Sequence, residues 1–199
     1  IDETYHSVHG AVSESLHVFI QAAWQQCPKQ ELRILEVGFG TGLNAYLSAI
    51  EAEKESKMVH YTAVEKYPLS EEIWQSLNYA QNYGCNQPLF QDLHSAEWGK
   101  EESITPHFSL QKQRGDFLCL PLSQTFDLIY FDAFSPEKQP ELWTEEVFAK
   151  LYAHTSVGGI LTTYCAKGAV RRAMQAVGYM VERIAGAAGK REMLSARKL

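Results

Sequence analysis

Hydrophobic positions follow two different periods along this chain, one typical of strands and one of helices. Short apolar runs that end in turn residues predict strands at 32–37, 59–65, 108–113, 126–132, 158–165 and 179–186. Apolar residues at helical spacing predict helices at 42–55, 69–84, 141–155 and 168–178. Strands that alternate with helices predict an α/β fold, in which a mostly parallel sheet carries helices on both faces.

The end of the chain departs from this alternation. After the strand at 179–186, the sequence turns through "GAAGK" and continues as a strand-like segment, 191–199. A tight turn between neighbouring strands makes them antiparallel. We therefore predict a seven-stranded sheet with an antiparallel C-terminal strand, the Rossmann-like pattern of class I methyltransferases. Residues 85–106 are expected to form a long loop or irregular insertion.

Composition adds limits to this picture. With 199 residues and 45% hydrophobic content, residues 1–199 are expected to form one domain, with 1–30 as a candidate N-terminal extension. The apolar runs are far below the ~20 residues that span a bilayer, and the first ten residues are polar, so a cytoplasmic location without membrane contact is expected. The four cysteines form no C-x-x-C pair and the histidines are scattered, so no metal site is expected.

A glycine-rich turn follows the first predicted strand in "EVGFGTGLN". Gly38, Gly40 and Gly42 form G-x-G-x-G, and Leu43 stands where a dinucleotide loop would have its third glycine, which disfavours a nicotinamide enzyme. Glycines let the backbone approach a ligand, and the helix that follows offers free N–H groups to a carboxylate. The turn favours S-adenosylmethionine, although a purely structural turn would use the same residues. Candidate cofactor-binding residues here are Glu36, Gly38, Phe39, Gly40, Gly42 and Asn44.

Three acids follow three predicted strands. Glu65, next to Lys66, is placed to accept ribose hydroxyls, and Asp116 to accept the adenine amino group, with Phe117 packing on the adenine ring. Asp132 ends the strand at 126–132 and is the candidate catalytic residue, also expected beside the cofactor. Glu65 or Asp116 alone would more often be a strand-end cap or a surface charge. Together they indicate a ligand site, because open α/β sheets bind ligands at the carboxyl ends of their strands.

Charge is divided unevenly along the chain. Residues 1–166 carry 10 Lys or Arg against 22 Asp or Glu, whereas residues 167–199 carry 8 against 2. A basic segment of this kind is either a solvated surface or a nucleic-acid contact. Arg171 and Arg172 are adjacent on a predicted helix, about 100° apart, so one of them is expected to be structural. Candidate phosphate contacts are Lys167, Arg171, Arg172, Lys190 and Arg191.

Several strings of residues carry a more specific resemblance. In order, "EVGFGTGLN", "VEKYPL", "GD", "DAFSPEKQPELWT", "GAVRRAMQAVGY" and "GKREML" resemble the methyltransferase domain of the MnmC family, which completes 5-methylaminomethyluridine at the tRNA wobble position. The N-terminal "YHSVHGAVSESLHVF" is similar to that family's opening segment, except that His6 stands where Phe is usual. The resemblance covers nearly the whole chain and is weakest at 85–106.

The resemblance implies methyl transfer from S-adenosylmethionine to the aminomethyl group of 5-aminomethyl-(2-thio)uridine in the anticodon stem-loop of tRNA. Asp132 would then orient the amine and stabilise the charge that develops on nitrogen, while Phe134 and Trp143 wall or brace the base pocket. Lys138 would meet phosphate or face solvent. In fused relatives an FAD-dependent oxidase domain acts first, so an oxidase is an expected partner, fused or separate.

Two other readings stay open from the residues alone. The same fold serves methyltransferases of small-molecule amines and aminopropyltransferases that use a decarboxylated cofactor, and neither needs a basic face. A non-catalytic docking domain of a tRNA-modifying assembly is the other. Retention of the three glycines, Glu65, Asp116 and Asp132 argues against this last reading.

Overall fold

One eight-stranded sheet organises the chain in the computed structural model, which describes residues 8–187 and 189–199. The strand order is β3-β4-β2-β1-β5-β6-β8-β7. The strands span Glu31–Val37 (β1), Met58–Glu65 (β2), Glu101–Thr105 (β3), Phe108–Arg114 (β4), Phe126–Phe131 (β5), Thr155–Thr163 (β6), Met180–Ala185 (β7) and Glu192–Arg197 (β8).

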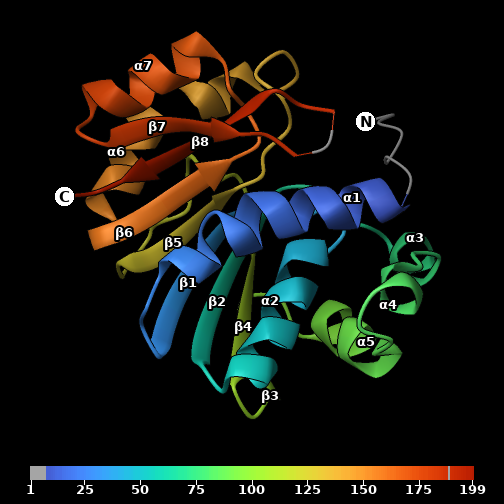
Figure 1. Cartoon of the computed structure of the whole chain (residues 1–199). Coiled ribbons are helices and arrows are strands. Elements are labelled where there is room, and N and C mark those ends of the chain that lie inside the picture. The colour runs from blue at the N-terminus through green and yellow to red at the C-terminus, as the bar shows by residue number, and fades with distance from the viewer. Residues whose placement is uncertain (1–7, 188) are drawn as a thin grey trace.

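Helices cover both faces of the sheet (Figure 1). The α-helices span Val8–Ser15 (α1), Leu43–Glu55 (α2), Glu71–Gln75 (α3), Tyr79–Asn82 (α4), Gln87–Ser95 (α5), Glu145–Ala153 (α6) and Gly168–Ala176 (α7). A π-helix Leu16–Gln21 (η1) and 3₁₀ turns Trp24–Gln26 (η2) and Pro140–Trp143 (η3) complete the set. None of these helices, within the described part of the chain, is both long and apolar enough to span a bilayer.

The class I methyltransferase topology is confirmed. Strands β4, β2, β1, β5 and β6 run parallel to one another, and β8 inserts antiparallel between β6 and β7. The carboxyl ends of the parallel strands therefore meet at one edge of the sheet. That edge carries Glu65, Asp116 and Asp132.

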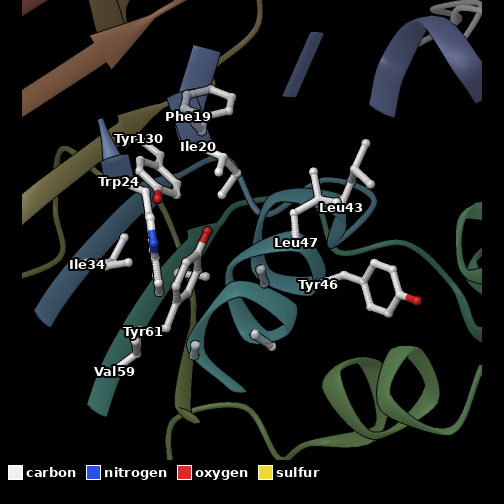
Figure 2. Packing of buried hydrophobic residues seen from close by; sticks show 14 of the residues in the cluster. Phe19, Ile20, Trp24, Ile34, Leu43, Tyr46, Leu47, Val59, Tyr61 and Tyr130 are labelled. Atoms are coloured by element: carbon white, nitrogen blue, oxygen red, sulfur yellow. The ribbon is translucent and has the colours of Figure 1, made fainter. Parts of the chain in front are cut away.

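The core is divided between the two faces because neighbouring side chains of a strand point to opposite sides. Ile34 belongs to the apolar cluster that includes residues of α2 and α5, whereas Leu35 belongs to the cluster that includes residues of α6 and α7. Figure 2 shows how the N-terminal segment contributes to the first of these clusters: Phe19 and Trp24 lie beside Tyr130 of β5. The segment that precedes β1 is thus built into the core on this face. His6 lies outside the described residues.

Residues 85–106 were wrongly expected to be a loop or irregular insertion. They form α5 and β3, and β3 pairs antiparallel with β4, which adds an eighth strand to the seven expected. The helix expected at 69–84 is also interrupted, because α3 ends at Gln75 and α4 begins at Tyr79. The helix expected at 141–155 begins as η3, and α6 starts only after Thr144, whose side chain accepts a hydrogen bond from the Val147 N–H.

Candidate functional site

A cavity of about 410 Å³ opens at the carboxyl edge of the sheet. It is lined by residues from the loops after β1, β2, β4 and β5 and by residues of α1 and η1. Of the residues named from the sequence, those lining the cavity are Gly38, Phe39, Gly40, Asn44, Glu65, Lys66, Asp116, Phe117, Asp132, Phe134 and Lys190.

Two of the three glycines in the glycine loop after β1 lie so close to neighbouring residues that a side chain would not fit. Gly38 has φ +97°, and a Cβ added to it would lie 2.6 Å from the Asp132 carbonyl oxygen. Gly40 has φ +51° and no atom within 4 Å of an added Cβ, so its open side belongs to the cavity. Gly42 does not line the cavity: an added Cβ there would lie 2.9 Å from His94 Nε2. Its small size serves the packing of the loop against α5.

Glu65 joins two loops at the end of β2. Its Oε2 accepts a hydrogen bond from the Gly40 N–H at 2.9 Å, and its Oε1 accepts one from the Tyr67 N–H at 2.8 Å. Each carboxylate oxygen has a further lone pair. The side chain is therefore fixed in the cavity wall while it keeps capacity for ligand hydroxyls.

Asp116 is held in a similar way after β4. Lys66 Nζ donates to Asp116 Oδ2 at 2.7 Å, and the Leu118 N–H donates to Oδ1 at 3.0 Å. These donors, led by Lys66, hold the pKa of Asp116 below its usual value. Phe117, the next residue, is buried and lines the cavity. A carboxylate beside an aromatic side chain matches the adenine subsite expected here.

Asp132 shares one amide with a second carboxyl group. Asn44 Nδ2 donates to Asp132 Oδ2 at 2.8 Å and to Glu36 Oε1 at 2.9 Å. Burial raises the pKa of Asp132 to about 6, although the Asn44 hydrogen bond opposes the shift. Glu36 is fully buried, and burial raises its pKa well above the usual range. Glu36 lies behind Asn44 and does not line the cavity, so its place is to orient that amide.

The loop at 132–139, here called the Asp132 loop, is pinned from two sides. Trp143 Nε1 donates to the Phe134 carbonyl at 2.9 Å, and the Tyr164 hydroxyl donates to the Ala133 carbonyl at 2.9 Å. Trp143 is buried against Phe131 and does not line the cavity. It therefore braces this loop, and Phe134 contributes to the cavity wall.

The basic residues named from the sequence occupy different settings. Lys190 lines the cavity, forms an ion pair with Glu14 and lies over the Tyr164 ring. Lys167 forms an ion pair with Glu137. Arg171 is partly buried, with a buried Nε, whereas Arg172 beside it is exposed, as the helical geometry requires for one of the two. Lys138 and Arg191 are exposed and lie outside the cavity.

Glu14 and Tyr164 line the cavity without having been singled out in the sequence. Tyr164 comes directly after β6, so the strand-end rule that found the three acids would also have found it. Glu14 had no such signal, because α1 reaches the cavity from the opposite end of the chain. Among residues 8–187 and 189–199, no cluster of three His, Cys, Asp or Glu side chains is arranged to hold a metal ion.

The chain is similar to known S-adenosyl-L-methionine-dependent methyltransferases. Residues 109–199 match a family described as S-adenosyl-L-methionine-dependent methyltransferase. The "tRNA 5-methylaminomethyl-2-thiouridine biosynthesis bifunctional protein MnmC" of Haemophilus ducreyi is 31% identical over 99% of this chain and 33% of its own length. The MnmC of Ectopseudomonas mendocina is 33% identical over 97% of this chain and 32% of its own. The crystal structure of MnmC2 from Aquifex aeolicus superposes with a TM-score of 0.74 at 25% identity, covering 94% of this chain and 61% of that one.

The chain is thus an S-adenosyl-L-methionine-dependent methyltransferase that is similar to the MnmC proteins over nearly its whole length. It spans about a third of the length of the two MnmC proteins.

The cavity of this MnmC-like chain fits S-adenosylmethionine on three counts. Its volume lies in the range of small-molecule sites. The open side of Gly40 leaves room for a ligand that a side chain would fill. The carboxylates of Glu65 and Asp116 supply acceptors for ribose hydroxyls and an adenine amino group, while Asp132 lies with Asn44 at a separate part of the wall. The residues that would hold the cofactor are thus Gly38, Gly40, Glu65, Asp116 and Phe117.

Proposed function

We propose that this chain methylates the aminomethyl nitrogen of 5-aminomethyl-(2-thio)uridine at the tRNA wobble position, giving 5-methylaminomethyl-(2-thio)uridine. One observation carries the proposal: the similarity to proteins named for tRNA 5-methylaminomethyl-2-thiouridine biosynthesis extends over 99% of the chain. It therefore includes the cavity and not only the cofactor loop. A tRNA substrate also makes the cytoplasm the expected place of action.

The acceptor must react as a neutral amine. A primary amine with the reference pKa of ~10.4 is neutral in only about one molecule in 2,500 at pH 7, a handicap of roughly 4.6 kcal/mol. S-adenosylmethionine, when bound, supplies an electrophilic methyl group on a positively charged sulfur, and that charge favours the neutral amine nearby. The Lys190 ammonium in the cavity wall acts in the same direction, while the Glu14 carboxylate paired with it acts in the opposite one.

Asp132 is suited to positioning more than to proton removal. With a pKa of about 6, it is too weak a base to take a proton from an alkylammonium ion. As a carboxylate it accepts an N–H bond from the amine and so aims the nitrogen lone pair. It would then stabilise the positive charge that appears on nitrogen as the N–C bond forms and the bond between the methyl group and sulfur breaks. S-adenosylhomocysteine would leave as a neutral thioether, and the proton would leave the nitrogen later to water.

The Asp132 loop and α1 complete the acceptor side of the cavity. Phe134 presents an aromatic ring, and Val18 with Phe19 presents apolar surface from η1. An unstacked base is commonly bound in a pocket of this kind. Trp143 and Tyr164 hydrogen-bond to the Asp132 loop and limit its movement. A rigid loop suits Asp132, because its carboxylate must hold the amine in line with the methyl group.

The test is methyl transfer from labelled S-adenosylmethionine into tRNA purified from cells that lack the activity, with the nucleosides separated and identified by mass. Label in 5-methylaminomethyluridine, with or without the 2-thio group, is the expected result. Glu72→Gln, which alters an exposed carboxylate on α3, should behave like the unaltered chain. Cofactor binding without label in tRNA would contradict the proposal and favour a small-molecule amine as acceptor.

Whether an oxidase supplies the substrate of this chain requires a separate experiment. The MnmC proteins of similar sequence are named as bifunctional, and this chain spans about a third of their length. We propose that an oxidase, fused or separate, delivers the aminomethyl substrate. Transfer to tRNA that carries 5-carboxymethylaminomethyluridine should then require added oxidase, whereas transfer to tRNA with the free aminomethyl group should not.

A further inference from the structure

Lys150 belongs to α6, one of the helices that cover the sheet (Figure 1), and its side chain contacts the backbone of Phe117, a residue that lines the cavity. Its Nζ donates to the carbonyl oxygens of Phe117 and Leu120, each at 2.6 Å, and lies 3.5 Å from that of Leu118. An ammonium group has three donors, and here all of them face one short turn. That turn, residues 116–120, begins with two residues that line the cavity, Asp116 and Phe117.

The turn has its own polarity. The N–H groups of Cys119 and Leu120 both donate to the Asp116 carbonyl, at 2.9 and 3.1 Å, and the Leu118 N–H donates to Asp116 Oδ1. The amides therefore point toward Asp116, while the other end of the turn presents carbonyl oxygens to Lys150. A cation at the carbonyl end of a turn is favourable for the same reason as at a helix C-terminus.

Apolar packing holds only part of this turn. Phe117 is buried and Leu120 packs against the same apolar cluster, whereas Leu118 and Cys119 between them are exposed. The ammonium group of Lys150 anchors the backbone of this stretch in addition to that packing. Lys150 Nζ also lies 4.5 Å from the centroid of the Phe117 ring, a cation–π distance. Phe117 is buried and lines the cavity, so one lysine touches both the backbone and the aromatic ring of the same subsite.

We propose that Lys150 is a positioning residue for the adenine subsite, holding the turn 116–120 so that Asp116 and Phe117 keep the geometry that recognises the adenine ring. The inference rests on S-adenosylmethionine as the cofactor and on adenine lying at Asp116. It does not depend on the identity of the methyl acceptor.

The experiment compares the unaltered chain with Lys150→Met, which keeps most of the side-chain length and removes the ammonium group. Calorimetry measures the Kd of S-adenosyl-L-homocysteine and of S-inosyl-L-homocysteine, which has a 6-oxo group in place of the 6-amino group. Lys150→Met should bind the adenosyl ligand about tenfold more weakly, because the turn loses charge-assisted hydrogen bonds. The preference for the adenosyl over the inosyl ligand should fall toward one, while kcat at saturating cofactor stays within about twofold.

Two variants control for a purely structural effect. Lys54→Met removes an exposed lysine that pairs with Glu51 on α2, and it should change neither Kd nor the base preference. Lys150→Arg keeps the charge and should retain most of the preference for the adenosyl ligand, even if Lys150→Met folds poorly. The melting temperature of unliganded Lys150→Met is expected to stay within a few degrees of the unaltered chain.

Unchanged adenosyl affinity and base preference in Lys150→Met would overturn the proposal. So would an equal fall in kcat, cofactor affinity and melting temperature with the base preference retained, because Lys150 would then serve the fold alone. Failure of the tRNA assay has a different signature: the unaltered chain would bind S-adenosyl-L-homocysteine with adenine preference but transfer no methyl group to tRNA.

Discussion

Asp132 combines a functional position with an unfavourable environment. Its carboxylate is desolvated, and Glu14 raises its pKa further, while Asn44 and Lys190 lower it. A group whose folded pKa of about 6 lies above its usual value of 3.8 destabilises the folded state as pH rises through that interval. Asp132 is therefore expected to contribute to turnover at a cost to the stability of the fold.

Asp132→Asn tests this trade-off. Turnover should fall about 10²- to 10³-fold, because the carboxylate that aims the amine is lost, while the Kd of S-adenosyl-L-homocysteine changes by only a few-fold. The free energy of unfolding, measured in urea, should rise by up to about 3 kcal/mol at pH 8 and change little at pH 4. An equal effect at both pH values would show that ionisation of Asp132 carries no folding penalty.

Gly38→Ala tests the contact between the glycine loop and the Asp132 loop. The new Cβ would meet the Asp132 carbonyl at 2.6 Å in a left-handed backbone, so we expect a loss of at least about 3 kcal/mol in unfolding free energy and no detectable cofactor binding. Gly99→Ala is the matched control, since φ is +85° there but no atom lies within 4 Å. That variant should lose only about 1–2 kcal/mol and bind normally. Equal losses in the two variants would exclude a role for the contact.

At the scale of elements, parallel strands could be predicted together with the residues at their ends. Glu65, Asp116 and Asp132 follow apolar runs, and parallel strands bring such residues to one edge whatever the loops do. Helix α5 could not be placed in the same way. Only three of its nine residues are buried, and its cap, Asn86, and its first-turn proline resemble loop residues. Its contact with the glycine loop depends on tertiary packing that no local pattern contains.

That contact is made by His94. Its Nε2 donates to the Thr41 carbonyl at 3.1 Å, and its ring stacks on Trp74 and meets Phe39 edge-on. Burial lowers the pKa of His94 from 6.5 to about 4. A depressed folded pKa means that the stability from the neutral ring is present above pH 6.5 and is lost as pH falls toward 4.

His94→Gln should therefore flatten the acid side of the stability profile. Between pH 7 and pH 4.5 the unaltered chain should lose about 2–3 kcal/mol of unfolding free energy through this residue, and the variant should not. Its affinity for S-adenosyl-L-homocysteine at pH 7 should fall several-fold, because the glycine loop loses its tie to α5. Urea titrations at the two pH values provide the measurement, with the surface residue His60→Gln as the control. A pH dependence that persists in His94→Gln would assign the acid sensitivity to other groups.

At the scale of the whole molecule, the basic residues that cluster in the last part of the sequence also lie on neighbouring elements of the fold. The eight basic residues of 167–199 belong to α7, the β7–β8 hairpin and the segments around them. Lys190 brings this basic end to the cavity, where it meets Glu14 of α1. A tRNA whose wobble base enters the cavity would thus have its backbone close to the basic end, in a protein of net charge −6.

Salt dependence of tRNA binding measures how many of these charges reach phosphates. Each phosphate contact contributes about −0.7 to −0.9 to the slope of log K against log salt. Arg172→Gln and Arg191→Gln alter exposed side chains, so each should weaken binding of the anticodon stem-loop and make the slope shallower by about one. Arg171→Gln should instead leave the slope unchanged, because Arg171 is partly buried and its Nε is not accessible to a phosphate. Lys54→Gln on α2 serves as the control, and anisotropy of a labelled stem-loop between 50 and 200 mM salt gives the slopes. Unchanged slopes for both exposed arginines would show that the basic end is a solvated surface, and tRNA would then have to be held through the cavity rim alone.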